Sequence, residues 1–171
     1  IVAALYVERG GVYWDDPRID AWDEARDARL YAGPLPVIAH PPCARWSAFS
    51  GMIEARHGYR EGDDGGCFEA ALVAVRMWGG VLEHPAHTKA FRHFGLPIPS
   101  RGGGWTGSFT DDGLSCWVDL GWYGHTLKKG TWLYVAGVDP APMRWGIGPG
   151  IRWPRADDKS DFPGGLSETQ R

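Results

Sequence analysis

Residues 67–85, CFEAALVAVRMWGGVLEHP, join a helical pattern directly to a short apolar run. Apolar side chains recur at three- and four-residue spacing from 67 to 78, which predicts a helix that is buried along one side. Two glycines end that helix, and residues 81–85 then predict a short strand that closes at a proline. A helix that leads at once into a strand is typical of a layered α/β fold.

The chain before this stretch continues the pattern. Residues 35–40, LPVIAH, form an apolar run next to prolines and predict a buried strand that ends at His40. Residues 3–7, AALYV, predict the first strand. The segment 20–31, DAWDEARDARLY, predicts a helix with Asp20 as its N-cap.

The chain after this stretch is rich in β-forming residues. Residues 115–123 and 131–137 predict two strands that form a C-terminal β-hairpin. The full order of elements favours one α/β domain over 1–171, a reduced Rossmann-like parallel sheet with helices on its faces and this hairpin at its end. Residues 139–171 are rich in proline and glycine, so we expect a surface tail, and we expect the printed sequence to stop short of its natural end.

Bulk composition mainly excludes functions. With 171 residues, 43% of them hydrophobic, the chain can bury one core and is not disordered. A net charge of −3 excludes a basic protein that coats DNA regardless of sequence, although a local patch could bind nucleic acid. No apolar run is long enough to cross a membrane. Three scattered cysteines indicate a reducing intracellular compartment, and ten tryptophans suit both cores and the stacking of bases.

The first motif with chemistry is the run 40–47, HPPCARWS, which follows the predicted strand 35–40. Two prolines fix the backbone and present Cys43 at a strand end, as a nucleophile requires. Arg45 would favour the thiolate, because a nearby cation lowers a cysteine pKa. A structural cysteine in a proline turn explains the same residues equally well.

Two further motifs lie at strand ends. Glu83 ends the strand before Pro85, where a carboxylate could contact an N–H edge of a base or move a proton, although a surface glutamate is the simpler explanation. The turn of the predicted hairpin carries basic residues beside aromatic ones, which suits contacts to phosphates and bases, or merely a solvated turn. Candidate substrate-binding residues flank the three motifs and are His40, Pro42, Arg45, Trp46, His84, Trp122, Tyr123, His125, Lys128 and Lys129.

Together these motifs resemble the catalytic half of the DNA C5-cytosine methyltransferases. The resemblance implies that Cys43 is the nucleophile that adds to C6 of cytosine, and that Glu83 is the carboxylate at N3 and the exocyclic amine. The chain also resembles small bacteriophage and prophage proteins that share DARLYAGP, HPPC, EHP and KxTWLY. We therefore expect an enzyme that modifies cytosine or a modified cytosine, in DNA or as a nucleotide, in the cytoplasm of a bacterial host cell.

The resemblance also implies S-adenosylmethionine as a possible methyl donor. Glu8, Gly10 and Gly11 stand where the family has its glycine-rich cofactor loop, but the family's FxGxGG pattern is absent. The cofactor site is thus reduced, the donor is a different one, or methyl transfer has been lost.

Two alternatives come from other functional classes. A non-catalytic protein that senses a base or nucleotide, in defence or anti-defence, could use the same scaffold. A zinc-dependent hydrolase could use the pairs His40-x-x-Cys43 and His84-x-x-His87, whose spacing suits a metal, although our preferred interpretation assigns no metal.

Overall fold

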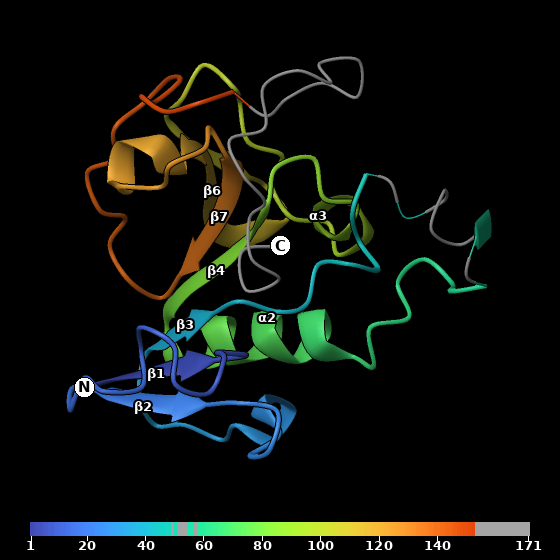
Figure 1. Ribbon diagram of the computed structural model, residues 1–171, viewed down its shortest axis with the longest axis vertical. Helices are drawn as coiled ribbons and strands as arrows, with labels where there is room; N and C mark the ends of the chain where they lie inside the picture. The colour runs from blue at the N-terminus through green and yellow to red at the C-terminus, as the bar shows by residue number, and fades with distance from the viewer. Residues whose placement is uncertain (49, 51–54, 57, 153–171) are drawn as a thin grey trace.

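The computed structural model describes residues 1–48, 50, 55–56 and 58–152, and these form a mixed α/β fold around one seven-stranded sheet (Figure 1). Across the sheet the strands lie in the order β2-β1-β3-β4-β7-β6-β5. Their bounds are β1 Val2–Leu5, β2 Ile19–Trp22, β3 Val37–Ala39, β4 Gly80–Pro85, β5 Trp105–Ser108, β6 Asp111–Asp119 and β7 Gly130–Ala136. The α/β class is confirmed, but the sheet is mixed and not parallel throughout.

The sheet has a parallel half and an antiparallel half. Strand β1 pairs in parallel with β2 on one side and β3 on the other, and β3 pairs in parallel with β4. The carboxyl ends of these four strands therefore meet at one edge. Strand β7 runs antiparallel to both β4 and β6, so the predicted C-terminal hairpin is confirmed.

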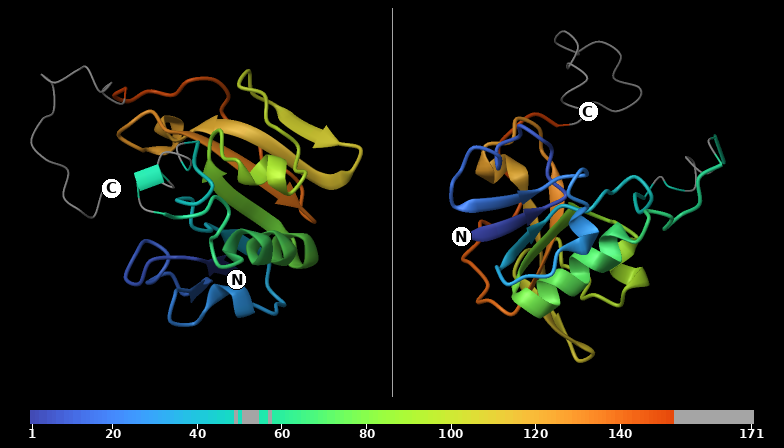
Figure 2. Two further views of the ribbon diagram at one scale, coloured as in Figure 1. Left: turned by 90° about the vertical axis from the view of Figure 1, so that its right-hand side faces the viewer. Right: turned by 90° about the horizontal axis from the view of Figure 1, so that it is seen from below.

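Helix α2, Cys67–Trp78, covers one face of the parallel half and has the predicted bounds (Figures 1 and 2). It buries a stripe of five side chains against the sheet: Phe68, Ala71, Leu72, Ala74 and Val75. Its start is fixed by Asp64, whose carboxylate accepts the backbone N–H groups of Gly66 and Phe68. Three further helical turns are short: η1 Ala28–Leu30, α3 Ala90–His93 and η2 Leu120–Tyr123.

The predicted helix over 20–31 is wrong. Residues Ile19–Trp22 pair with β1 as the edge strand β2, and only Ala28–Leu30 are helical, as one 3₁₀ turn. Asp27 adopts a left-handed backbone with φ 51°, and its side chain accepts the Arg29 N–H. An α-helix cannot pass through that conformation, so strand pairing outweighs the helix propensity of this segment.

Two predicted strands have different bounds in the structure. Strand β1 ends at Leu5, because Tyr6 turns the chain with a left-handed φ of 60°. The predicted strand 115–123 begins earlier, at Asp111, and its last four residues form η2. Both differences arise where backbone turns interrupt a run of β-forming residues.

A partly buried polar cluster joins α2 to the antiparallel half. The hydroxyl of Tyr134 on β7 donates to Asp111 Oδ1 at 2.7 Å and accepts from Arg76 Nε at 3.2 Å. Arg76 also pairs with the other oxygen of Asp111. Asp111 opens β6, so this cluster fixes the helix to both strands of the hairpin.

The chain after β7 packs along the hairpin loop. Leu127 and Ile151 form an isolated parallel bridge, and the Lys128 N–H donates to the Ile151 carbonyl at 2.9 Å. The predicted surface tail over 139–171 is described only to residue 152, and its remainder lies outside the described residues. No helix in the described part of the chain is long and apolar enough to span a membrane.

Candidate functional site

The carboxyl ends of β3 and β4 bring two predicted site residues into contact. His40 directly follows β3, and Glu83 lies on β4 one position beyond the paired residues Ala39 and Leu82. His40 Nδ1 lies 3.3 Å from Glu83 Oε2. Open sheets with parallel strands bind ligands at this edge, beside the point where the strand order reverses, which here lies between β1 and β3.

Tyr13, in the loop between β1 and β2, extends this contact into a chain of three residues. Its hydroxyl lies 2.9 Å from His40 Nε2. Glu83 Oε1, in contrast, is buried and has no hydrogen-bond partner within the described part of the chain. Glu83 therefore has one oxygen in contact with His40 and one oxygen without a hydrogen-bond partner among the described residues.

The charges around Glu83 keep its carboxyl ionised. Burial raises the pKa of Glu83, but the hydrogen bond with His40 and the charges of His40, Lys129 and His84 together lower it below its usual value. Lys129 directly precedes β7, four residues before Leu133, which pairs with Glu83, and its charge acts on Glu83 from there. Burial and the charge of Glu83 raise the pKa of Tyr13, so its hydroxyl keeps its proton.

Cys43 lies just beyond this contact, in the loop after β3, and its side chain is exposed. The Trp46 N–H donates to the Cys43 carbonyl at 3.0 Å and closes a turn. The Trp46 ring is only 3% exposed, packs against Phe68 and donates its Nε1–H to Asp64 at 2.7 Å. The Trp46 ring is therefore part of the core and anchors the Cys43 loop, which leaves little of the ring for its predicted contact with substrate.

A cavity of about 1050 Å³ opens at the same edge of the sheet, beside Pro42. Its walls come from the ends of β1 and β2, from η1 and from the start of α2. The charged lining consists of Glu8, Asp23, Glu24, Asp27, Arg9 and Arg29. Glu8 thus lies in a cavity, in keeping with its predicted role.

The glycines predicted to bind a cofactor take another role. Gly10 and Gly11 do not line the cavity but belong to a turn in which the Gly11 N–H donates to the Glu8 carbonyl at 3.0 Å. Gly10 adopts φ 74°, a conformation that favours glycine. The two glycines therefore shape the loop that carries Glu8.

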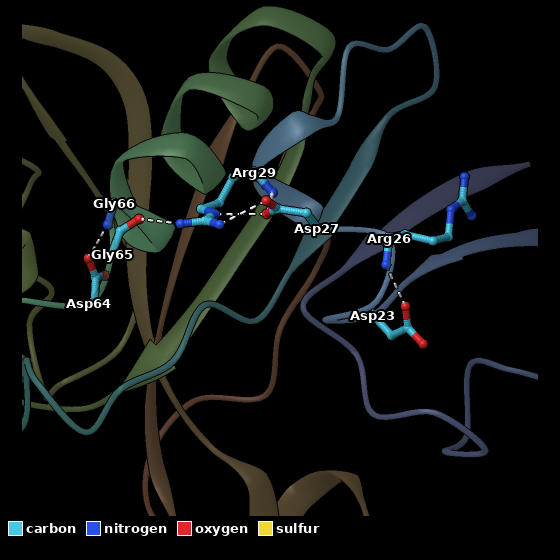
Figure 3. A network of polar contacts seen from close by, with 7 residues as sticks. All are labelled: Asp23, Arg26, Asp27, Arg29, Asp64, Gly65 and Gly66. Carbon is cyan, nitrogen blue, oxygen red and sulfur yellow. Dashed lines mark hydrogen bonds and ion pairs between the residues drawn. The ribbon is translucent and has the colours of Figure 1, made fainter.

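In the cavity lining, the groups that could bind an anion already contact other parts of the protein (Figure 3). Arg29 forms a fork with both oxygens of Asp27, at 2.7 and 2.8 Å, and donates to the Gly65 carbonyl at 3.0 Å. Asp64 occupies the free N–H groups at the start of α2. Negative charge therefore dominates the remaining lining, which disfavours a phosphate.

Two side chains in this lining keep unused hydrogen-bonding groups. One oxygen of Asp23 accepts the Arg26 N–H at 3.0 Å, and Figure 3 shows its second oxygen turned away from that contact. The Tyr6 hydroxyl is buried without a partner in the described residues, and burial raises its pKa, so it stays neutral. Tyr6 also holds its left-handed backbone at the end of β1, and such strain is frequent at functional sites.

His84, predicted to bind substrate, faces away from the site. Successive side chains of a strand alternate between faces, so His84 points to the face opposite Glu83, where it is 1% exposed. Its Nδ1 lies 2.7 Å from the Thr88 hydroxyl, and burial lowers its pKa to about 4. Among the described residues, no group of three or more His, Cys, Asp or Glu side chains could hold a metal ion, so the zinc alternative finds no site there.

The aromatic residues of the hairpin loop hold the following segment. Trp122 Nε1 donates to the Gly146 carbonyl at 3.1 Å, and the Tyr123 hydroxyl accepts the Arg144 N–H at 2.9 Å. Tyr123 remains 50% exposed, whereas Trp122 is partly covered. Both residues therefore have a structural partner besides their predicted role in stacking a base.

The predicted basic residues make different contacts in the structure. The charge of Lys129 acts on Glu83, whereas His125 contacts the backbone of its own turn and is exposed. Lys128 lies between them, partly exposed, with its N–H bound to the chain beyond β7. Arg45 stacks 3.6 Å above the ring of Tyr59. The structure thus brings the charges of His40 and Lys129 to act on Glu83. The other predicted cations, Arg45, His125 and Lys128, make separate contacts.

Comparisons with protein families, with curated proteins and with solved structures found no match in any of the three. Sequence reasoning missed Tyr13, Tyr6 and Asp23. No local signal points to Tyr13, because only the path of the loop between β1 and β2 brings it to His40. The helix predicted over 20–31 hides the position of Asp23, which directly follows the strand β2.

Proposed function

We propose that this protein is a group-transfer enzyme that modifies a pyrimidine base, cytosine or a modified cytosine, in DNA or as a nucleotide. The observation that carries the proposal is the placement of Cys43 and Glu83 at the ends of neighbouring parallel strands, beside a cavity that Pro42 helps to line. A pyrimidine reacts at C5 only after a nucleophile adds at C6. Such chemistry needs a thiol and a carboxylate in one place.

The residues of the site suit the two halves of this reaction. The Cys43 thiolate would add to C6, and the electron pair released to the ring would make C5 nucleophilic. Glu83 would accept an N–H of the exocyclic amine beside N3 with its free Oε1, while Lys129 balances its charge. After transfer at C5, loss of the C5 proton to solvent and cleavage of the bond between C6 and sulfur would restore the aromatic ring and the thiolate.

The cavity is the proposed site of the donor. It has the size of a ligand pocket, and its paired Arg29 and occupied helix start disfavour a phosphate. Asp23 offers an unused carboxylate oxygen to hydroxyl groups, and the acidic lining suits a cationic group. These residues fit S-adenosylmethionine, which would supply an electrophilic methyl group when bound.

The proposed partner is a nucleic acid or nucleotide. Lys128 and His125 in the hairpin loop and Arg45 in the Cys43 loop could contact phosphates, although the chain as a whole carries a net charge of −3. We place the reaction in the cytoplasm of a bacterial host cell, because the mechanism needs Cys43 as a free thiol.

An oligonucleotide that contains 5-fluorocytosine tests the proposal. Fluorine at C5 blocks the final elimination, which follows methyl transfer, so the wild-type protein with S-adenosylmethionine should gain the mass of one oligonucleotide plus one methyl group. Cys43→Ala should form no adduct, and Glu83→Gln should slow the adduct about 100-fold or more. Cys116→Ala, which removes a buried thiol of β6, is the matched control and should react as the wild type does.

The same experiment separates catalysis from mere binding. If the wild-type protein binds the oligonucleotide but forms no adduct, and Cys43→Ala binds equally well, the protein is a base sensor and not this enzyme. If peptide mass spectrometry places the adduct at Cys67 or Cys116, the assignment of Cys43 is wrong.

A further inference from the structure

The chain Tyr13–His40–Glu83 carries an inference about the carboxylate itself. We infer that Tyr13 and His40 are positioning residues that fix one oxygen of Glu83 and leave the other as the acceptor for substrate. This inference rests on the proposed function of Glu83. Its basis is the contact of both imidazole nitrogens of His40, at 2.9 Å with Tyr13 and at 3.3 Å with Glu83 Oε2.

The three groups determine where the proton on a neutral imidazole lies. Glu83 is ionised and can only accept a hydrogen bond, so His40 Nδ1 must carry the proton that it donates. Nε2 then has a lone pair, which accepts the hydroxyl proton of Tyr13. Without Tyr13, either nitrogen could carry the proton, and the alternative tautomer would turn a lone pair toward the carboxylate.

Holding Oε2 in this way leaves Oε1 with a defined role. Oε1 is buried and makes no hydrogen bond to the described part of the chain, which is costly for an ionised carboxylate. A substrate N–H that reaches Oε1 would remove this cost. The site therefore selects a ligand that presents a donor at this point, and the pair Tyr13–His40 keeps Glu83 from turning away.

The loop that carries Tyr13 also forms part of the cavity wall. Glu8 and Arg9 line the cavity, and the turn that begins at Glu8 leads directly to Tyr13. One loop therefore touches both the proposed donor site and the imidazole that holds Glu83. Changes in the loop that spare Tyr13 should not alter the tautomer of His40.

Nitrogen-15 NMR of the full chain at pH 8 tests the positioning role without any substrate. Long-range correlations report the tautomer of each imidazole, and the His40 signals are those lost in His40→Asn. The wild-type protein should show a proton on Nδ1, and Tyr13→Phe should show a mixture of both tautomers. Val12→Ala, a change at a 91% exposed residue of the same loop, should match the wild type. An unchanged tautomer in Tyr13→Phe would overturn the inference.

Adduct formation with the fluorinated oligonucleotide gives the second measurement. Tyr13→Phe and His40→Ala should lower the maximal rate tenfold or more with little change in the oligonucleotide concentration at half-maximal rate. His40→Asn should recover part of the rate, because its amide N–H can replace Nδ1. Equal rates for His40→Ala and the wild type would refute the positioning role. If the wild-type protein forms no adduct, the proposed function fails, and the NMR result alone decides the inference.

Discussion

Replacing Asp64 with alanine should destabilise the protein by about 2–4 kcal/mol. Its carboxylate accepts two backbone N–H groups at the start of α2, and the loss of such a cap costs about 0.5–2 kcal/mol. It also accepts the Nε1–H of Trp46, whose ring is 3% exposed. A buried donor left without a partner costs roughly 1–3 kcal/mol more.

Urea denaturation followed by tryptophan fluorescence measures this cost. Asp63→Ala is the matched control, because Asp63 is exposed and its change should alter the free energy of unfolding by less than about 0.5 kcal/mol. Trp46→Phe removes the donor, so Asp64→Ala should cost about 1–2 kcal/mol less in that background.

Two results would refute this reasoning. A loss below about 1 kcal/mol in Asp64→Ala would show that Asp64 does not hold the helix and the ring together. If Asp64→Ala costs the same in the wild-type background and in the Trp46→Phe background, the double-mutant cycle shows no coupling, and the bond to Nε1 contributes nothing. Either result would also remove the explanation for why Trp46 is buried next to the Cys43 loop.

Three other properties can be tested. Burial lowers the pKa of His84 to about 4 in the folded protein, whereas it is about 6.5 in the unfolded chain, so between these pH values only the unfolded chain binds a proton at His84. The free energy of unfolding should therefore fall by up to about 3 kcal/mol as the pH drops from 6.5 to 4. His84→Gln should remove this pH dependence, which urea denaturation at several pH values can measure. Iodoacetamide should alkylate exposed Cys43 first, Cys67 more slowly and Cys116 only on unfolding, as peptide mass spectrometry can follow, because burial raises the pKa of the last two thiols. Tyr134→Phe should lower the free energy of unfolding in urea by about 1–2 kcal/mol, because its hydroxyl joins Arg76 on α2 to Asp111 on β6 in the partly buried cluster.

The elements that the sequence predicted correctly have strong local patterns. Helix α2 has its apolar stripe and flanking glycines, and β3, β4 and β7 are apolar runs with clear ends. The helix predicted over 20–31 is wrong because these residues favour a helix, while pairing with β1 decides the outcome. Pairing between distant strands leaves no trace in local periodicity.

The site was predictable only in part, for the same reason. His40 and Glu83 follow from the rule that parallel strands end at one edge, and Lys129 follows from the hairpin. Tyr13 depends on the path of a loop, and the burial of Trp46 depends on its bond to Asp64. Contacts made by loops need the folded backbone before they can be named.

The strand order has a consequence for how the chain folds. Ala3 pairs with Val37, Val37 with Gly80, and Gly80 with Ala136. Each central strand therefore pairs with a strand that lies far away in the sequence. Closing such long loops costs entropy before any contact compensates, which makes folding slow compared with a helical protein of this length. During synthesis, β4 gains its second neighbour only when β7 has left the ribosome. The edge that carries Glu83 therefore gains Lys129, which directly precedes β7, only at this point.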